Sequence, residues 1–177
     1  MKLIERKEYL DRLIALKEKQ VIKIITGIRR CGKSTLFEMY QEYLLQQKVT
    51  KSQIIAINLE DFDFFELRDP RKLYDYINTR LVHDQISYVF LDEVQHVQDF
   101  PDVVNSLFIK KNIDLYLTGS NAYMLSSEIA TLISGRYIEI AMLPLSFREY
   151  VSSTGNINEL DQKYVEYLQH SSFPYAL

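Results

Sequence analysis

Near the start of the chain stands the octapeptide Gly27-Ile28-Arg29-Arg30-Cys31-Gly32-Lys33-Ser34. It matches G-x-x-x-x-G-K-[ST], the pattern of phosphate-binding loops. Gly27 and Gly32 allow backbone conformations that a Cβ atom would forbid, so the N–H groups of the loop can converge on an anion. Lys33 adds a positive charge against the β- and γ-phosphates, and the next residue offers a hydroxyl to Mg²⁺. The octapeptide therefore predicts a site for a nucleotide phosphate.

The segments on either side of the octapeptide supply the context that this pattern needs. Residues 21–26 form a short β-branched run that predicts a buried strand. Residues 35–48 lack Gly and Pro and are rich in Leu, Glu and Gln, which predicts a helix whose N-terminus attracts phosphate. The alternative is an ordinary strand-to-helix turn, which leaves Gly32-Lys33-Ser34 unexplained.

The composition is that of a globular protein. The chain has 177 residues, of which 47% are hydrophobic and 25% charged, and its net charge of −3 gives no general attraction for nucleic acid. No apolar run approaches the roughly 20 residues that span a bilayer, and the N-terminus becomes charged too early for a signal peptide, so a cytoplasmic location is expected. The single cysteine excludes an internal disulfide, and the three histidines lie too far apart in sequence to suggest a metal site.

Strand-like and helix-like segments alternate along the rest of the chain. Further strands are expected at residues 53–59, 87–91, 114–118 and 137–143. Helices are expected at residues 3–19, 69–83, 100–111, 121–134, 147–151 and 160–169. Apolar strands that alternate with helices predict an α/β fold with a parallel sheet covered on both faces.

A polar segment at residues 152–156 is the best candidate for a domain boundary. We therefore expect a phosphate-loop domain with a lead-in helix at residues 1–151. Residues 152–177 would begin a helical C-terminal region. The last residues form a mixed apolar turn without a closing element, which predicts that the sequence is a fragment of a longer protein.

Two acids follow the apolar run of residues 88–91, namely Asp92 and Glu93. Side chains at the carboxyl end of a strand in a parallel sheet project toward the ligand crevice. There Asp92 would reach Mg²⁺ and Glu93 could act as the base that activates a water molecule. The alternative is an acidic turn after a core strand. The sequence contains no Asn-Lys-x-Asp motif for reading guanine, so ATP is favoured over GTP.

Polar residues also follow the expected strand at residues 114–118. Ser120 or Asn121 could orient the attacking water and sense the γ-phosphate, although Asn121 could equally cap the next helix. Arg136 precedes the last expected strand and could reach a γ-phosphate, commonly that of a neighbouring subunit, as an arginine finger. It could also be an ordinary surface arginine.

A further acidic pair, Glu60-Asp61, follows the strand expected at residues 53–59. For this pair, a cap or a contact with Arg29 or Arg30 is favoured over catalysis.

Several motifs that follow one another in the chain together resemble a known family. They are the octapeptide, Asn58-Leu59-Glu60-Asp61, Leu91-Asp92-Glu93-Val94-Gln95, Leu117-Thr118-Gly119-Ser120-Asn121, Ser134-Gly135-Arg136 and Leu143-Pro144-Leu145-Ser146-Phe147-Arg148-Glu149-Tyr150. The set is similar to the AAA-type ATPase domain of a large prokaryotic family related to archaeal ATPases and the AAA+ group. Members usually carry a second, C-terminal domain of unassigned function.

The resemblance implies a P-loop NTPase fold, a three-layer α/β/α sandwich with a five-stranded parallel sheet in the order 5-1-4-3-2. It implies Mg²⁺ binding by Ser34 and Asp92, base catalysis by Glu93, a sensor at Ser120 or Asn121, and a finger at Arg136. The residues that it implies for ATP binding are Gly27, Ile28, Arg29, Arg30, Cys31, Gly32, Lys33, Ser34 and Thr35.

These observations lead to one principal hypothesis and three alternatives. The principal one is a Mg²⁺-dependent ATPase whose hydrolysis cycle switches an attached domain or a partner, including another copy of the chain. The first alternative is a nucleotide-binding scaffold without meaningful turnover. A small-molecule phosphotransferase would need an acceptor pocket and an arginine-rich lid, for which the sequence offers no segment. A DNA-associated ATPase is permitted by the resemblance but is not supported by the charge.

Overall fold

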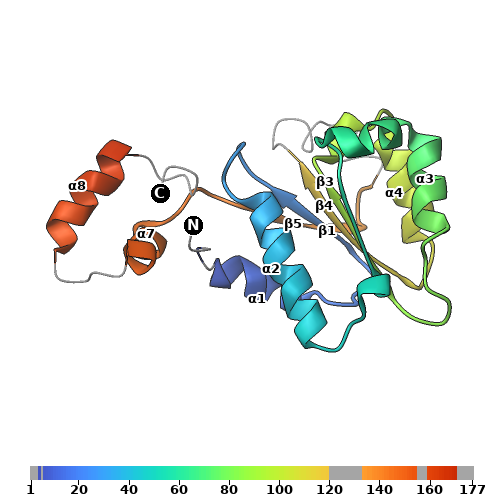
Figure 1. The fold of residues 1–177 in the computed structure, drawn as a ribbon, viewed down its shortest axis with the longest axis horizontal. Coiled ribbons are helices and arrows are strands. Elements are labelled where there is room, and N and C mark those ends of the chain that lie inside the picture. The colour runs from blue at the N-terminus through green and yellow to red at the C-terminus, as the bar shows by residue number, and fades with distance from the viewer. Residues whose placement is uncertain (1–3, 5, 120–132, 155–158, 171–177) are drawn as a thin grey trace.

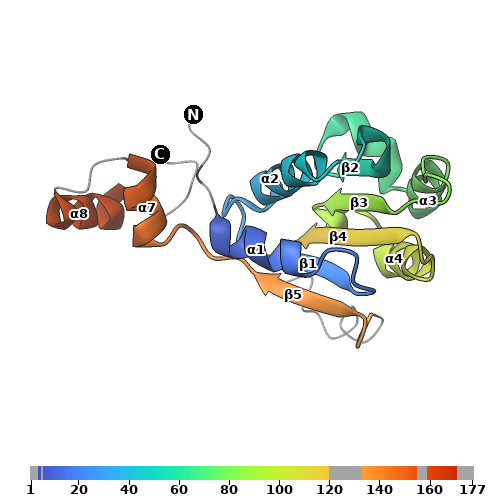
Figure 2. The same cartoon turned by 90° about the horizontal axis from the view of Figure 1, so that it is seen from below.

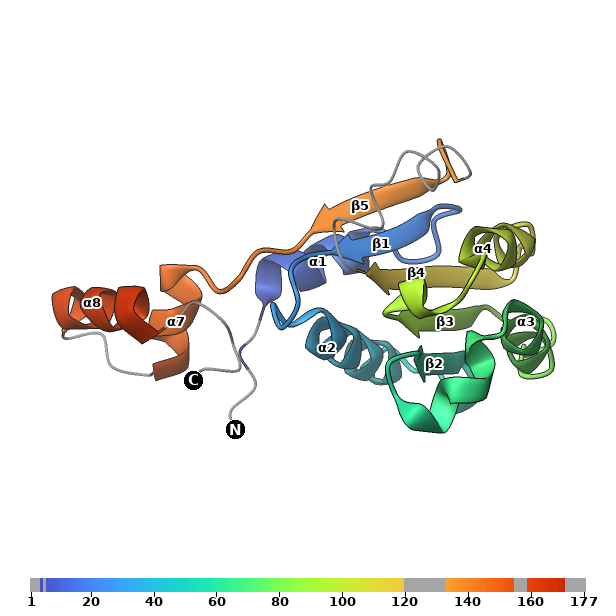
Figure 3. The same cartoon turned by 90° about the horizontal axis from the view of Figure 1, so that it is seen from above.

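The computed structural model describes residues 4, 6–119, 133–154 and 159–170 (Figure 1). Its centre is a sheet of parallel strands in the order β2-β3-β4-β1-β5, which confirms the predicted order 5-1-4-3-2 (Figure 3). The strands are β1 (Ile22–Thr26), β2 (Ile54–Asn58), β3 (Ser87–Asp92), β4 (Ile113–Gly119) and β5 (Tyr137–Ala141). Among the described residues, none of the helices has both the length and the apolar character needed to cross a membrane.

Helices cover both faces of this sheet (Figure 2). One face packs against α1 (Lys7–Ala15) and α2 (Lys33–Gln46), and the other packs against α3 (Pro70–Asn78) and α4 (Phe100–Phe108). Short 3-10 turns link these elements at η1 (Lys51–Gln53), η2 (Phe62–Arg68) and η3 (Val94–His96).

Strand β3 shows why its sequence reads as a continuous apolar run. Tyr88 and Phe90 belong to the core under α1 and α2, whereas Val89 and Leu91 belong to the core under α3 and α4. Every residue of β3 is buried, as expected for a parallel sheet with helices on both faces. The predicted three-layer α/β/α sandwich is therefore confirmed.

The last two helices, α7 (Phe147–Thr154) and α8 (Leu160–His170), stand apart from the sheet (Figure 1). Aromatic rings join them to each other. The ring of Phe147 lies 5.1 Å from that of Tyr164 and 5.6 Å from that of Tyr167, and Tyr150 lies 5.5 Å from Tyr167. Residues 152–154 of the expected boundary form the last turn of α7, and residues 155 and 156 lie outside the described residues.

Two helices are shorter than predicted, and local hydrogen bonds close the chain at their ends. Helix α3 ends at Asn78 rather than at residue 83. Just after Asn78, the Thr79 hydroxyl donates to the Tyr76 carbonyl at 3.0 Å. Helix α4 ends at Phe108 rather than at residue 111, in a tight turn where the Lys110 N–H donates to Leu107 O at 3.0 Å.

Of the helix predicted at residues 3–19, the structure describes α1, which ends at Ala15. A buried polar cluster binds the backbone of the residues that follow α1. Lys23 and Asp114 form an ion pair in adjacent strands, with their side chains almost inaccessible to solvent. Lys23 Nζ also donates to Lys19 O at 2.8 Å, and the Glu18 N–H donates to Asp114 Oδ2 at 2.8 Å. Burial lowers the pKa of Lys23, and the Asp114 carboxylate opposes that shift. These contacts anchor the segment between α1 and β1 to the sheet.

The remaining predicted elements agree with the structure apart from their ends. Helix α2 begins two residues earlier than predicted, because the phosphate loop leads directly into it, and β5 ends at Ala141 rather than at residue 143. Residues 121–132, most of a further predicted helix, lie outside the described residues.

Candidate active site

The octapeptide forms a loop between β1 and α2. Its backbone has positive φ angles at Arg30 (68°) and Gly32 (101°), the type of conformation that turns successive N–H groups toward one point. Gly32 is the residue before α2 and has no side chain with which to cap the helix, and the first turn of α2 contains no acidic residue. A loop of this shape at an unblocked helix N-terminus fits a phosphate group.

The Lys33 side chain lies across this loop and is almost fully buried, with 3% of it exposed. Its Nζ atom donates to Gly27 O at 3.1 Å and lies 3.3 Å from Oε1 of Glu93. The loop and the acid that follows β3, which are far apart in sequence, are thus brought together as predicted. A phosphate bound in the loop would offer Lys33 a full negative charge in place of a carbonyl dipole.

Ser34 and Asp92 meet in the manner expected of two ligands for one cation. The Asp92 carboxylate interacts with the Ser34 side chain and accepts a hydrogen bond from the Thr118 hydroxyl. Burial raises the pKa of Asp92, its interactions with the Ser34 and Thr118 hydroxyls lower it, and the negative charge of Glu93 raises it further. A hydroxyl and a carboxylate side by side at the phosphate loop are oxygen donors of the kind that Mg²⁺ prefers, so these residues fit that ion.

Glu93 is held firmly in an unusual backbone conformation. It lies directly after β3 with φ 54° and ψ 51°, in the left-handed region that non-glycine residues seldom adopt. One carboxylate oxygen faces Lys33, and the other accepts a hydrogen bond from the Gln95 amide. The second amide atom of Gln95, Oε1, is buried and has no hydrogen-bond partner among the described residues. Strained backbone of this kind is concentrated at functional sites.

Thr118 is a member of the site that the sequence analysis did not identify. This fully buried residue of β4 donates its hydroxyl hydrogen to Asp92 Oδ1 and accepts the Glu93 N–H at 2.9 Å. One hydroxyl therefore orients both acids. The pairing of Leu91 with Leu117 in the sheet places Thr118 beside Asp92, so the register of β3 and β4 is the signal that would have identified it.

Arg136 lies far from the phosphate loop of its own chain. Its carbonyl accepts the Ile22 N–H at 2.8 Å, at the start of β1, whereas the loop begins at the other end of that strand. Five residues of extended strand separate the two ends by about 17 Å. The Arg136 guanidinium donates to Asn105 Oδ1 at 2.9 Å. The two expected sensor residues, Ser120 and Asn121, lie outside the described residues.

The other predicted loop residues are divided between the surface and the interior. Ile28, Arg29 and Arg30 are exposed, and Arg29 forms the expected ion pair with Glu60. Cys31 is buried and Thr35 is half-buried at the start of α2. Burial raises the pKa of the Cys31 thiol, although the positive charge of Lys33 opposes this shift, so the thiol stays protonated at neutral pH.

Comparison with known families and proteins agrees with this geometry. A family model described as an AAA domain matches residues 19–151. An uncharacterized protein of Haemophilus influenzae is 39% identical over 176 residues, which are 97% of this chain and 44% of that protein. The uncharacterized protein MJ1544 of Methanocaldococcus jannaschii is 32% identical over 130 residues, which are 73% of this chain and 28% of that protein. The chain thus spans less than half the length of these curated relatives.

Solved structures share the fold at low sequence identity. A Walker-type ATPase of Pyrococcus abyssi superposes with a TM-score of 0.61 at 15% identity, over 97% of this chain and 64% of that one. The Orc1 protein of Aeropyrum pernix, solved in complex with DNA, gives 0.59 at 14% identity, over 93% of this chain and 50% of that one. Cdc6p of Pyrobaculum aerophilum gives 0.58 at 14% identity, with the same two coverages. These likenesses support the P-loop NTPase fold.

Proposed function

This chain belongs to the AAA domain family of P-loop ATPases, and from that membership we propose that it binds ATP with Mg²⁺ and hydrolyses it to ADP and phosphate. The observation that supports this proposal most is that the phosphate loop and the two acids at the end of β3 lie together. Lys33 lies 3.3 Å from Glu93, and the side chain of Ser34 interacts with that of Asp92. An ordinary strand-to-helix turn gives no reason for a buried lysine, two acids and two hydroxyl groups to meet at one edge of a sheet.

Each residue would have a separate task in the reaction. The loop N–H groups and Lys33 bind the phosphates, and Ser34 and Asp92 hold the Mg²⁺ ion, which when bound offsets the charge of the phosphate oxygens. Glu93 takes a proton from the attacking water molecule while the oxygen of that water forms a bond to the γ-phosphorus. The bond from that phosphorus to the bridging oxygen breaks, and the electron pair leaves with ADP.

The role of Glu93 is tested by phosphate release from Mg-ATP. We expect Glu93→Gln to lower turnover by about 10²- to 10⁴-fold, because the amide cannot accept the proton, while the variant still binds the nucleotide. Glu42→Gln is a matched control, since Glu42 is an exposed residue of α2. Equal turnover in the wild type and the Glu93→Gln variant would remove Glu93 as the base.

We also propose that Arg136 acts on the nucleotide of a second copy of the chain. In its own copy it lies about 17 Å from the loop, at the opposite end of the strands. The proposal can be tested by mixing Lys33→Ala and Arg136→Ala proteins, each nearly inactive alone. The Lys33→Ala protein retains Arg136 and the Arg136→Ala protein retains the loop, so activity should reappear in the mixture. A mixture as inactive as its two components would exclude action between copies.

The switch on an attached region is the remaining part of the proposal. Helices α7 and α8 pack on each other and are joined to the sheet by the segment that follows β5 (Figure 1). We propose that residues 1–151 form the ATPase domain, that residues 152–177 begin the C-terminal region, and that the hydrolysis cycle moves that region.

A further inference from the structure

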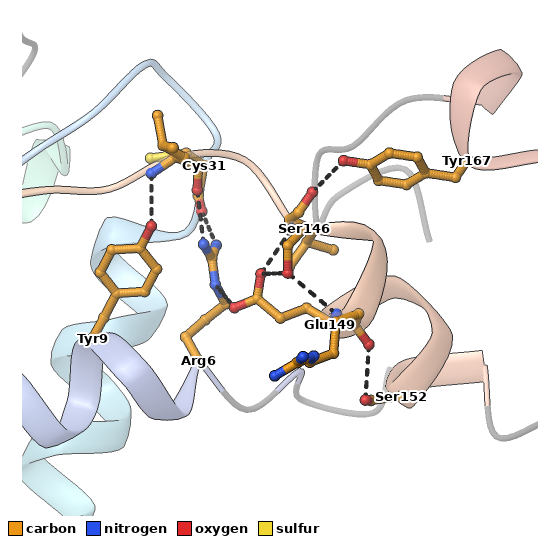
Figure 4. A network of polar contacts seen from close by, with 10 residues as sticks. Arg6, Tyr9, Cys31, Ser146, Glu149, Ser152 and Tyr167 are labelled. Atoms are coloured by element: carbon orange, nitrogen blue, oxygen red, sulfur yellow. Dashed lines mark hydrogen bonds and ion pairs between the residues drawn. The ribbon is translucent and has the colours of Figure 1, made fainter. Parts of the chain in front are cut away.

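We infer that Arg6 is a positioning residue that connects the phosphate loop to α7, an inference that rests on the proposed ATPase function. Arg6 precedes α1 and is 3% exposed. Its guanidinium group donates to three segments at once, as Figure 4 shows. Nη1 donates to Cys31 O at 3.0 Å, Nη2 donates to Leu143 O at 2.8 Å, and Nε donates to Glu149 Oε1 at 2.7 Å.

The bond to Cys31 fixes one peptide group of the phosphate loop. The C=O and N–H bonds of a trans peptide group point in opposite directions. Because Arg6 holds the Cys31 carbonyl, the Gly32 N–H points to the side away from Arg6. Gly32 has a φ of 101°, so this peptide group sits in a part of the loop that depends on a glycine. Arg6 thereby sets the direction of a donor that a bound phosphate would use.

The bond to Glu149 fixes the start of α7. Oε2 of the same carboxylate accepts hydrogen bonds from Ser146 N and Ser146 Oγ, both at 2.8 Å (Figure 4). The residues Ser146-Phe147-Arg148-Glu149 thus form a capping box, in which the glutamate reaches back to the backbone of the residue before the helix. One carboxylate therefore joins Arg6 to the first turn of α7.

The segment between β5 and α7 is held by the same group of residues. Besides the bond from Arg6 to Leu143 O, the Leu143 N–H donates to the Tyr9 hydroxyl at 3.2 Å. The Arg6 guanidinium lies 4.8 Å from the centre of the Tyr9 ring, a cation–π contact. The loop and α7 thus share one almost buried arginine, whose planar, multiply donating group a lysine cannot replace.

A connection of this kind works in both directions. If a bound phosphate changes the orientation of the peptide group between Cys31 and Gly32, Arg6 and Glu149 must adjust and α7 must follow. By thermodynamic linkage, if nucleotide binding shifts the conformational equilibrium of α7, a substitution at Glu149 that shifts this equilibrium must alter nucleotide affinity. Glu149 does not touch the phosphate loop in the described contacts.

Calorimetry with Mg-ATP tests this connection through three variants. We expect Arg6→Lys and Glu149→Gln each to weaken Mg-ATP binding by about 5- to 150-fold, the usual range for coupled sites. Arg12→Lys is the matched control, because Arg12 is an exposed arginine of α1 that makes a long 3.5 Å contact with Glu139 O. It should bind Mg-ATP as the wild type does.

Hydrogen–deuterium exchange of the amides in residues 147–154 supplies a second readout. In the wild type we expect their exchange to change when Mg²⁺ and a slowly hydrolysed ATP analogue are added, and we expect that change to disappear in the Arg6→Lys and Glu149→Gln variants. Circular dichroism establishes that each variant is folded, and Glu149→Gln alone suffices if Arg6→Lys is not.

The outcomes separate the connection from the proposed function. If the wild type binds the nucleotide and a folded Arg6→Lys or Glu149→Gln variant shows the same change in α7 exchange as the wild type, the connection alone is overturned. The connection is also overturned if the wild type binds the nucleotide and its α7 exchange does not change. A folded wild type that binds no Mg-ATP would overturn the proposed function, and the connection with it.

Discussion

Replacing Gly27 by alanine is the sharpest structural test of the phosphate loop. A Cβ atom at this position would lie 2.5 Å from Met142 O and 2.7 Å from Cys31 Sγ. Non-bonded heavy atoms sit at about 3.5 Å or more, so these contacts would be too short by about 0.8 to 1 Å. The Met142 carbonyl is backbone, and the Met142 N–H donates to Thr26 O at 2.7 Å, so this segment cannot move away without breaking that bond.

The size of the effect follows from this crowding. Overpacking a closely packed site costs about 1–3 kcal/mol, and we expect Gly27→Ala to fall in the upper part of that range because one of its neighbours is backbone. For a chain of this length, a loss of about 2–3 kcal/mol lowers the melting temperature by about 4–12 °C. Displacement of the loop should also weaken Mg-ATP binding by more than tenfold, which corresponds to about 1.4 kcal/mol.

Gly135→Ala is the matched control for this experiment. Gly135 has a φ of 74°, and a Cβ there would meet nothing within 4 Å, so its cost is a backbone cost of about 1–2 kcal/mol. Thermal melting by circular dichroism and calorimetry with Mg-ATP would be measured for both variants. Gly135→Ala should lose stability without losing Mg-ATP affinity, whereas Gly27→Ala should lose both. A Gly27→Ala protein with wild-type melting temperature and affinity would refute the close approach of the loop to the segment after β5.

Two further variants probe the acids at the end of β3. Burial raises the folded-state pKa of Asp92 above its unfolded value, so the stability that its protonated form contributes is lost as pH rises through the folded pKa. Without Mg²⁺, the Asp92→Asn variant should therefore melt at a higher temperature than the wild type at pH 7. This difference in melting temperature should vanish below about pH 3.9. A wild type more stable than the variant at pH 7 would contradict this prediction. Thr118→Val should cost about 1–3 kcal/mol in urea unfolding and reduce phosphate release, because it leaves the half-buried Glu93 N–H without the Thr118 hydroxyl as its partner. Thr118→Ser, which keeps the hydroxyl, should retain both properties, and a fully stable valine variant would count against this role.

The sequence was most informative where the signal is local. The octapeptide and the acids after β3 depend on residue types at fixed spacing, and both lie where the motifs predict. The strands were recognisable because a sheet covered on both faces requires nearly continuous apolar runs. The strand order came from the family resemblance and was confirmed in full.

Contacts between residues distant in sequence were not predictable in this way. Arg6 and Glu149 are separated by 143 positions, and only the capping box at α7 has a local signature. The position of Thr118 beside Asp92 depends on the register of two parallel strands, which the residues of either strand alone do not determine. The early end of α1 has the same origin, since Lys23 and Asp114 each lie in an apolar strand and meet only in the folded sheet.

Isothermal titration calorimetry with Mg-ATP, comparing the wild type with Lys33→Ala, tests whether the phosphate loop binds a nucleotide. The buried Lys33, at hydrogen-bond distance from Gly27 O and beside Glu93, is the residue that we propose binds the phosphates. We expect the wild type to bind one Mg-ATP per chain and the folded Lys33→Ala protein to show little or no binding heat. A folded wild-type protein that releases no heat with Mg-ATP, or a Lys33→Ala variant that binds equally well, would contradict the account.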